Sequence, residues 1–166
     1  MTDASRSDEQ RKLFDMIKDI KVAMMTTVDD DGTLRSRPMW NAQAKPGEDI
    51  WFMTRASSPK TDEIDKERKV NLSYANASSQ DYVSISGAAT VSQDRAKIKE
   101  LFAEPMRTWF PKGADDPEIA LIRVRIEKGE YWDSPSGLMV YAYGYVKAVL
   151  TGEPPKPGDH EKVNLR

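Results

Sequence analysis

The chain has 166 residues, with 27 acidic and 25 basic side chains, no cysteine and a single histidine, His160. This length predicts one domain with a core that is stable without disulfides. The composition excludes thiolate nucleophiles, iron–sulfur clusters and cysteine zinc sites, and argues against a histidine metal site or a Ser-His-Asp triad. A net charge of −2, no long apolar run and a polar N-terminus predict a cytoplasmic protein that binds neither nucleic acid nor membrane.

The N-terminal part of the chain predicts a helix followed by a β-hairpin. Ser7 and Gln10 form a capping box, and apolar residues then recur at helical spacing, which predicts an amphipathic helix over 8–20. Two extended runs, 21–28 and 33–42, flank a cluster of aspartates and a glycine, as in a hairpin.

The rest of the chain predicts short strands with inserted helices. The strands are expected at 50–54, 70–75, 82–91 and 119–132, and the helices at 60–69, 94–103 and 137–150. Gly87 predicts a bulge or a close backbone approach within its strand. Hairpin-linked strands without a βαβ rhythm favour a small barrel or sandwich with helices at its ends. We expect this domain to span 1–152 and a polar tail, beginning with a Pro-rich linker, to span 153–166.

The segment Ser58-Pro59-Lys60 carries the clearest chemical signal. Proline is favoured at the first helical position, which makes Ser58 the cap and Lys60 the second helical residue. A helix start already carries about half a positive charge and unpaired N–H groups, so a lysine there has the unfavourable sign. A bound anion explains this placement, because phosphate accepts hydrogen bonds from N–H groups, a hydroxyl and an ammonium together.

Residues on two neighbouring strands suit the same anion. Thr54 and Arg55 end the preceding strand, while Arg35 and Arg37 alternate along the hairpin strand and so share one face of it. The planar fork of arginine matches the oxygens of phosphate. The sequence therefore predicts a phosphate pocket between two strands and a helix start.

Both the lysine and the tryptophans also have a purely structural interpretation. Asp62 and Glu63 lie in the same first turn and suit the helix dipole, so Lys60 can pair with one of them or point to water. Trp109 lies in an irregular stretch and Trp132 ends a strand. An indole at such a place flanks a planar ring, covers the edge of a core or fills a subunit interface.

The order of the motifs resembles the general stress protein 26 group of the pyridoxamine 5′-phosphate oxidase-like, FMN-binding split-barrel proteins. The resemblance covers about residues 14–150. It is carried by Thr26-Thr27-Val28, Arg35-Ser36-Arg37-Pro38-Met39, Trp51-Phe52-Met53-Thr54, Ser58-Pro59-Lys60, Asp81–Gly87, Trp109-Phe110-Pro111 with Asp116-Pro117, and Glu130–Gly137.

The resemblance implies a mainly β (α+β) fold, a six-stranded antiparallel split β-barrel with flanking helices that forms a homodimer with FMN in clefts at the interface. Arg37 and Lys60 resemble the phosphate ligands, with hydroxyls from Thr54 and Ser58. The flavin wall is implied to include Pro38, Met39, Trp40, Met53, Trp109 (from its own or the partner subunit) and Trp132.

The chain departs from the vitamin B6 oxidases of that family. Pro59 stands where they carry an arginine beside the lysine, Ala42 where they carry a lysine, and 133–138 lacks their arginine–histidine pair. Oxidation of pyridoxamine phosphate is therefore not expected, and no catalytic residue is assigned.

Three functions stay open. The chain is a redox protein that uses FMN with NAD(P)H or another small electron donor, a non-catalytic protein that stores or senses FMN, or a dimeric barrel with an empty cleft. Haem binding is disfavoured because only His160 is available as a histidine ligand.

Overall fold

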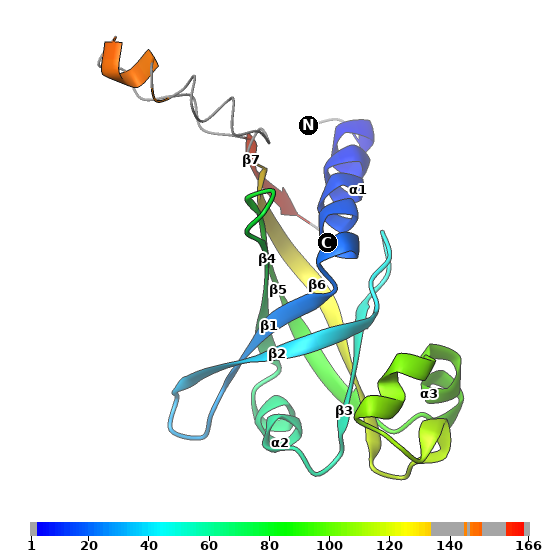
Figure 1. The fold of residues 1–166 in the computed structure, drawn as a ribbon. Helices are drawn as coiled ribbons and strands as arrows, with labels where there is room; N and C mark the ends of the chain where they lie inside the picture. Colours follow the sequence, from blue (N-terminus) through cyan, green and yellow to red (C-terminus); the bar gives the residue numbers. More distant parts are fainter. Residues whose placement is uncertain (1–2, 134–144, 146, 151–158, 165–166) are drawn as a thin grey trace.

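The computed structural model describes residues 3–133, 145, 147–150 and 159–164. Its strands are β1 (Val22–Val28), β2 (Leu34–Gln43), β3 (Ile50–Arg55), β4 (Lys69–Asn76), β5 (Asp81–Ser92), β6 (Ile119–Asp133) and β7 (Asp159–Asn164). All pairings are antiparallel, in the order β3-β2-β1-β4-β5-β6-β7. Because β3 also pairs with β6, strands β1 to β6 close into a barrel (Figure 1).

The helices flank this barrel at its two ends. Helix α1 (Asp3–Ile20) lies at one end, and α2 (Pro59–Lys66) and α3 (Arg95–Leu101) lie at the other (Figure 1). Two 3₁₀ turns, η1 (Glu104–Thr108) and η2 (Gly113–Asp115), follow α3. The predicted six-stranded barrel with flanking helices is therefore confirmed, and α1 begins five residues earlier than the expected 8–20.

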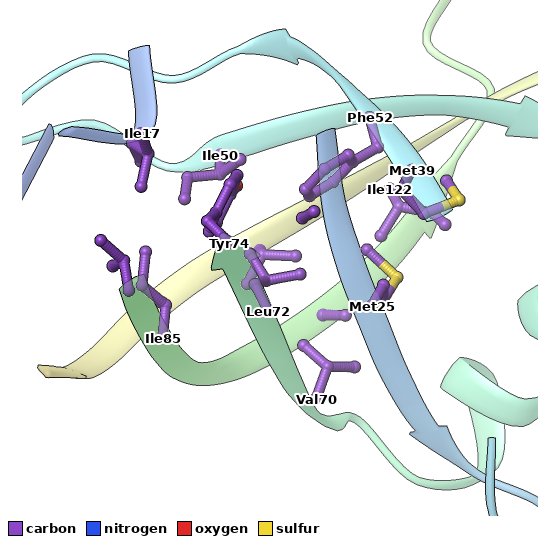
Figure 2. Packing of buried hydrophobic residues seen from close by; sticks show 14 of the residues in the cluster. Ile17, Met25, Met39, Ile50, Phe52, Val70, Leu72, Tyr74, Ile85 and Ile122 are labelled. Carbon is purple, nitrogen blue, oxygen red and sulfur yellow. The ribbon is translucent and has the colours of Figure 1, made fainter. Parts of the chain in front are cut away.

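The main core fills the barrel. The strands alternate buried and exposed side chains, and the inward members pack with Leu13, Phe14 and Ile17 of α1. Figure 2 shows this packing around Phe52 and Tyr74. A second, smaller cluster joins α3, η1 and the start of β6, and it holds this segment against the barrel beside β3.

Gly87 is required where β5 bends. The pairing register with β6 shifts between Ser86 and Gly87, which is the bulge that the sequence predicts. A Cβ atom at Gly87 would lie 2.4 Å from the carbonyl oxygen of Arg125, so the predicted close backbone approach is also confirmed.

The C-terminal part differs from the expectation at one point. The sequence analysis places 159–164 in a polar tail, whereas these residues form β7 along β6. A strand this polar is not readable from periodicity, because only its pairing with β6 defines it. Of the predicted helix 137–150, Tyr145 and 147–150 are described and helical; the remainder and the linker 153–158 lie outside the described residues.

Within the described ranges, every helix is too short or too polar to cross a lipid bilayer.

Candidate functional site

A cavity of about 500 Å³ lies beside the start of α2, between β2, β3 and η1. This volume is typical of small-molecule sites, roughly 300–1,000 Å³. Eight of the ten site residues predicted from the sequence line it: Pro38, Met39, Trp40, Met53, Thr54, Ser58, Lys60 and Trp109. The fold thus brings together residues from two strands, a helix start and a distant 3₁₀ segment.

Lys60 reaches the cavity from the first turn of α2. Ser58 is the N-cap and Pro59 the first helical residue, as the sequence predicts. The Lys60 ammonium donates hydrogen bonds to Thr54 Oγ1 at 2.9 Å and to Ser58 Oγ at 2.6 Å. Among the described residues no carboxylate lies within ion-pair distance of Lys60. The purely structural pairing with Asp62 or Glu63 is therefore not what the chain adopts.

The surroundings of Lys60 disfavour its positive charge. Partial burial of the ammonium lowers the pKa of Lys60, the positive charge of Arg37 lowers it further, and Glu63 opposes both effects. The hydroxyl of Ser58, which in most helices would accept from the helix N–H groups, instead faces the ammonium. The cation and the open helix start together form an anion site that the chain itself leaves uncompensated.

Arg37 lies behind this lysine rather than on the cavity wall. Its Nη2 donates to Glu63 Oε2 at 2.7 Å, and its Nη1 donates to the hydroxyl of Thr27, which in turn donates to the same carboxylate. The side chain keeps one fifth of its surface exposed. Lys60 lies three residues before Glu63 on α2, so the ion pair of Arg37 with Glu63 brings the two cations to one face of this helix. Direct contact of Arg37 with a ligand stays a prediction.

Aromatic rings and thioethers form the walls of the cavity. Trp40 and Trp109 are both about half exposed (46% and 49%), and their ring centroids lie 6.0 Å apart at an interplanar angle of 52°. Met53 and Met106 line the space between these rings and the second core cluster. A planar apolar ring suits such walls.

Further residues line the cavity, among them Arg55, which the sequence predicts as part of the phosphate pocket, and Ser57 and Met106, which it does not predict. Arg55 donates from Nη2 to the carbonyl oxygen of Trp109 at 3.0 Å, and its guanidinium lies 5.8 Å from the ring centre of Phe110. This contact ties the segment after η1 to the end of β3 and so shapes one wall. The position of Arg55 next to Thr54 was a usable signal, whereas Ser57 and Met106 carried none.

Trp132 lies apart from this cavity within the protomer. It is close to the C-terminal end of β6, in register with Tyr82 of β5 and His160 of β7. Only the opposite end of β6, 119–124, pairs with β3. The role of Trp132 beside a flavin ring therefore stays a prediction. For Trp132 to take this role, it would have to reach the cavity of a second copy of the chain.

The geometry suits a ligand with an anionic group at one end and a planar ring at the other. Lys60, Thr54 and Ser58 give one cavity its cationic and hydroxyl groups, and Trp40, Trp109 and Met53 give it aromatic and thioether groups. Such a division between a few placed polar groups and apolar walls is typical of cofactor sites.

Comparison with known proteins gives a family match over most of the chain. The family model described as pyridoxamine 5′-phosphate oxidase like matches residues 8–156. Protein bli-3 of Neurospora crassa is 31% identical over 144 residues, covering 81% of this chain and 69% of bli-3.

Solved structures have the same fold. A candidate general stress protein 26 from Jannaschia sp. CCS1 superposes with a TM-score of 0.74 at 23% identity, covering 95% of this chain and 98% of that one. The general stress FMN/FAD binding protein of Xanthomonas citri superposes with a TM-score of 0.68 at 25% identity, covering 79% and 92%. The resemblance stated from the motifs is thereby confirmed.

Proposed function

The chain belongs to the pyridoxamine 5′-phosphate oxidase-like family, and on this premise we propose that it is a general stress flavoprotein that binds FMN non-covalently in the cavity beside α2. A related protein of similar fold, from Xanthomonas citri, is an FMN/FAD binding protein. The cavity offers polar groups for a phosphate and apolar walls for a planar ring, and FMN carries a phosphate at one end and a planar ring at the other.

The observation that carries this proposal is the position of Lys60. A half-buried ammonium at a helix start, held by two hydroxyls and by no carboxylate among the described residues, is unfavourable until an anion arrives. A phosphate monoester there would accept from the Lys60 ammonium, from the hydroxyls of Thr54 and Ser58 and from the backbone N–H of Lys60, since Pro59 has no N–H and the N–H of Thr61 donates to the carbonyl oxygen of Ser58. Arg37 adds positive charge from behind.

The opposite end of the cavity supports the ring. Pro38, Met39 and Trp40 of β2 and Met53 of β3 line the cavity, together with the half-exposed indole of Trp109. Once bound, the flavin would supply hydride and electron transfer, while this chain binds, orients and partly desolvates it. NAD(P)H or another small donor is the proposed source of electrons. Redox use of the flavin is the finer part of the proposal, and flavin storage or sensing is its alternative.

We further propose that a homodimer completes the cleft. In support, large aromatic side chains stay exposed along the sheet, including Trp40, Tyr82 and Trp132. A cavity half open to solvent gains its missing wall if Trp132 of a second copy approaches it. Dilution that dissociates such a dimer should release the flavin, and a monomer that retains its flavin would contradict the arrangement.

The direct test compares FMN with riboflavin, which lacks only the phosphate. Fluorescence titration should show FMN binding tighter by about 30-fold or more, since a desolvated charge pair contributes roughly 2–5 kcal/mol. Equal affinity for the two flavins would overturn the phosphate site. The visible spectrum of the purified protein and the mass of the released ligand distinguish FMN from FAD.

A second experiment decides between redox protein and storage protein. Reduced nicotinamide is mixed with the FMN-loaded protein without air, and the flavin absorbance is followed. Bleaching within seconds supports the redox function, and an unchanged spectrum supports storage or sensing. Pyridoxamine phosphate should not be oxidised, since Ala42 and Pro59 depart from the B6 oxidases. Cytoplasmic location stays a prediction.

A further inference from the structure

Glu63 is a buried carboxylate that the phosphate floor itself does not use. It lies on α2 with 4% of its surface exposed. Its Oε2 accepts from Thr27 and from Arg37, whereas its buried Oε1 accepts no hydrogen bond from the residues that the structure describes. The Nη1 of Arg35 lies 3.7 Å from Oε1, and Arg35 is itself paired with Asp29.

A buried carboxylate is costly unless its partners compensate it. Here the hydrogen-bonding partners of Glu63, which lies on α2, come from two other elements: Thr27 from β1 and Arg37 from β2. Thr27 is fully buried, so its hydroxyl has no access to water and is committed to this network. The guanidinium of Arg37 therefore donates within this network from both of its terminal nitrogens.

We propose that Glu63 is the positioning residue of the anion site, which acts on a bound phosphate through Arg37. This inference rests on the proposed function, in which the phosphate of the flavin lies on Lys60. The carboxylate and Thr27 hold one side of the Arg37 fork, and the remaining N–H groups are thereby presented toward Lys60.

The charges of the three side chains support this role. Arg37 lowers the pKa of Lys60 and Glu63 raises it, so all three groups interact. Two cations without a ligand between them repel each other, and a freely rotating Arg37 would turn away from Lys60 toward water. The buried carboxylate prevents this and keeps both cations in place before the anion binds, which lowers the reorganisation that binding requires.

A double-mutant cycle tests the proposal. Glu63→Met keeps the side-chain length and removes both acceptor atoms, and Arg37→Ala removes the group on which Glu63 acts. We expect Glu63→Met to weaken FMN binding about 10- to 50-fold in the otherwise unsubstituted protein. In the Arg37→Ala background the same substitution should weaken binding by less than about threefold. The difference between the two losses is a coupling energy in the range for residues in contact. The riboflavin affinity of Glu63→Met should stay within about twofold of that of the unsubstituted protein, because riboflavin has no phosphate on which Arg37 can act.

The matched control is Asp62→Asn, which removes an exposed carboxylate from the preceding position of α2. It should leave FMN affinity unchanged. Tighter FMN binding by Glu63→Met would show that Glu63 only adds negative charge. An equal loss for riboflavin would show a general structural role. An undiminished loss in the Arg37→Ala background would overturn the route through Arg37.

If Glu63→Met does not fold, the cycle is repeated with Glu63→Gln, which keeps one acceptor. The expected loss is then about two- to fivefold, again absent beside Arg37→Ala.

A measurement without flavin separates this proposal from the proposed function. In the apoprotein, NMR of the Arg37 guanidinium should show slow rotation of the N–H groups, and Glu63→Gln should speed this rotation. Fast rotation in the unsubstituted protein would overturn the positioning role even if FMN binds. Failure to bind FMN, with slow rotation present, would instead overturn the phosphate site.

Discussion

The two ends of helix α2 each carry a lysine, and the two ammonium groups have different partners and pKa values shifted in opposite directions. Lys66, in the last turn, lies 2.7 Å from both carboxylate oxygens of Asp30, and its hydrogen bond with Asp30 raises its pKa. Lys60, in the first turn, has two hydroxyls and a lowered pKa. Lys66 has a favourable sign for the helix dipole and Lys60 an unfavourable one.

The starts of helices α2 and α3 are also capped differently. Asp94 caps α3 conventionally, because its carboxylate accepts from the backbone N–H groups of Ala96 and Lys97. Ser58 occupies the same position at α2 but caps nothing with its side chain, since its hydroxyl accepts from Lys60.

The difference indicates where an external ligand is expected. Where the chain supplies its own counter-charge or cap, a charged group contributes to stability and needs no further partner. Where one helix start has neither a counter-charge nor a side-chain cap from the chain, its ammonium and its unpaired backbone N–H are available to an anion. We therefore expect substitutions at the start of α2 to change FMN binding and equivalent substitutions elsewhere to change only stability.

Charge reversal at the two lysines should separate them most strongly. Lys60→Glu places a carboxylate where the phosphate is proposed to lie, and we expect a loss of about 2–5 kcal/mol in FMN binding free energy. Apoprotein stability should not fall, because an acidic residue suits a helix start. Fluorescence titration and urea unfolding measure the two quantities.

Lys66→Glu is the matched control for that experiment. It disrupts an exposed pair with Asp30, so FMN affinity should be unchanged. Unchanged FMN affinity in Lys60→Glu, or an equal loss in both variants, would remove the distinction between the two ends of α2.

Removal of the two cap side chains should have opposite consequences. Asp94→Ala loses a working cap and should cost about 1 kcal/mol of unfolding free energy, with FMN affinity unchanged. Ser58→Ala should cost less than about half of that, because no cap bond is lost, and should weaken FMN binding about three- to tenfold. Equal destabilisation by the two substitutions would show that Ser58 serves the helix rather than the site.

The pH dependence of stability should show the smallest effect, with opposite signs for the two lysines. The folded-state pKa of Lys60 lies below its ordinary value of 10.5, so the unfolded chain binds more protons and unfolding free energy rises with pH just below that value. The folded-state pKa of Lys66 is raised, so its contribution is present below 10.5 and is lost above it.

Urea unfolding between about pH 8 and pH 11 measures this difference. Lys60→Met should abolish the rise, and Lys66→Met should abolish the fall. Saturating FMN should remove the rise in the unsubstituted protein, since a bound phosphate favours the charged lysine. If the free energy of unfolding still rises with pH in Lys60→Met, another titrating group causes the rise.

The sequence by itself determined the local features: the alternation of the strands, the bulge at Gly87, the cap at Asp94 and the helix start at Ser58-Pro59-Lys60. Each depends on residues close together in the chain, through periodicity, glycine conformation or capping chemistry.

Only the tertiary structure decided the role of Glu63, whose partners Thr27 and Arg37 are 36 and 26 residues away. A first-turn acid is locally indistinguishable from a solvent-exposed one, as Asp62 beside it shows. Likewise β7 exists only as a partner of β6, and the cavity wall at Trp109 depends on the contact with Arg55. Barrel closure buries these groups and brings them together, because pairing and burial arise from the whole fold and not from neighbours in the chain.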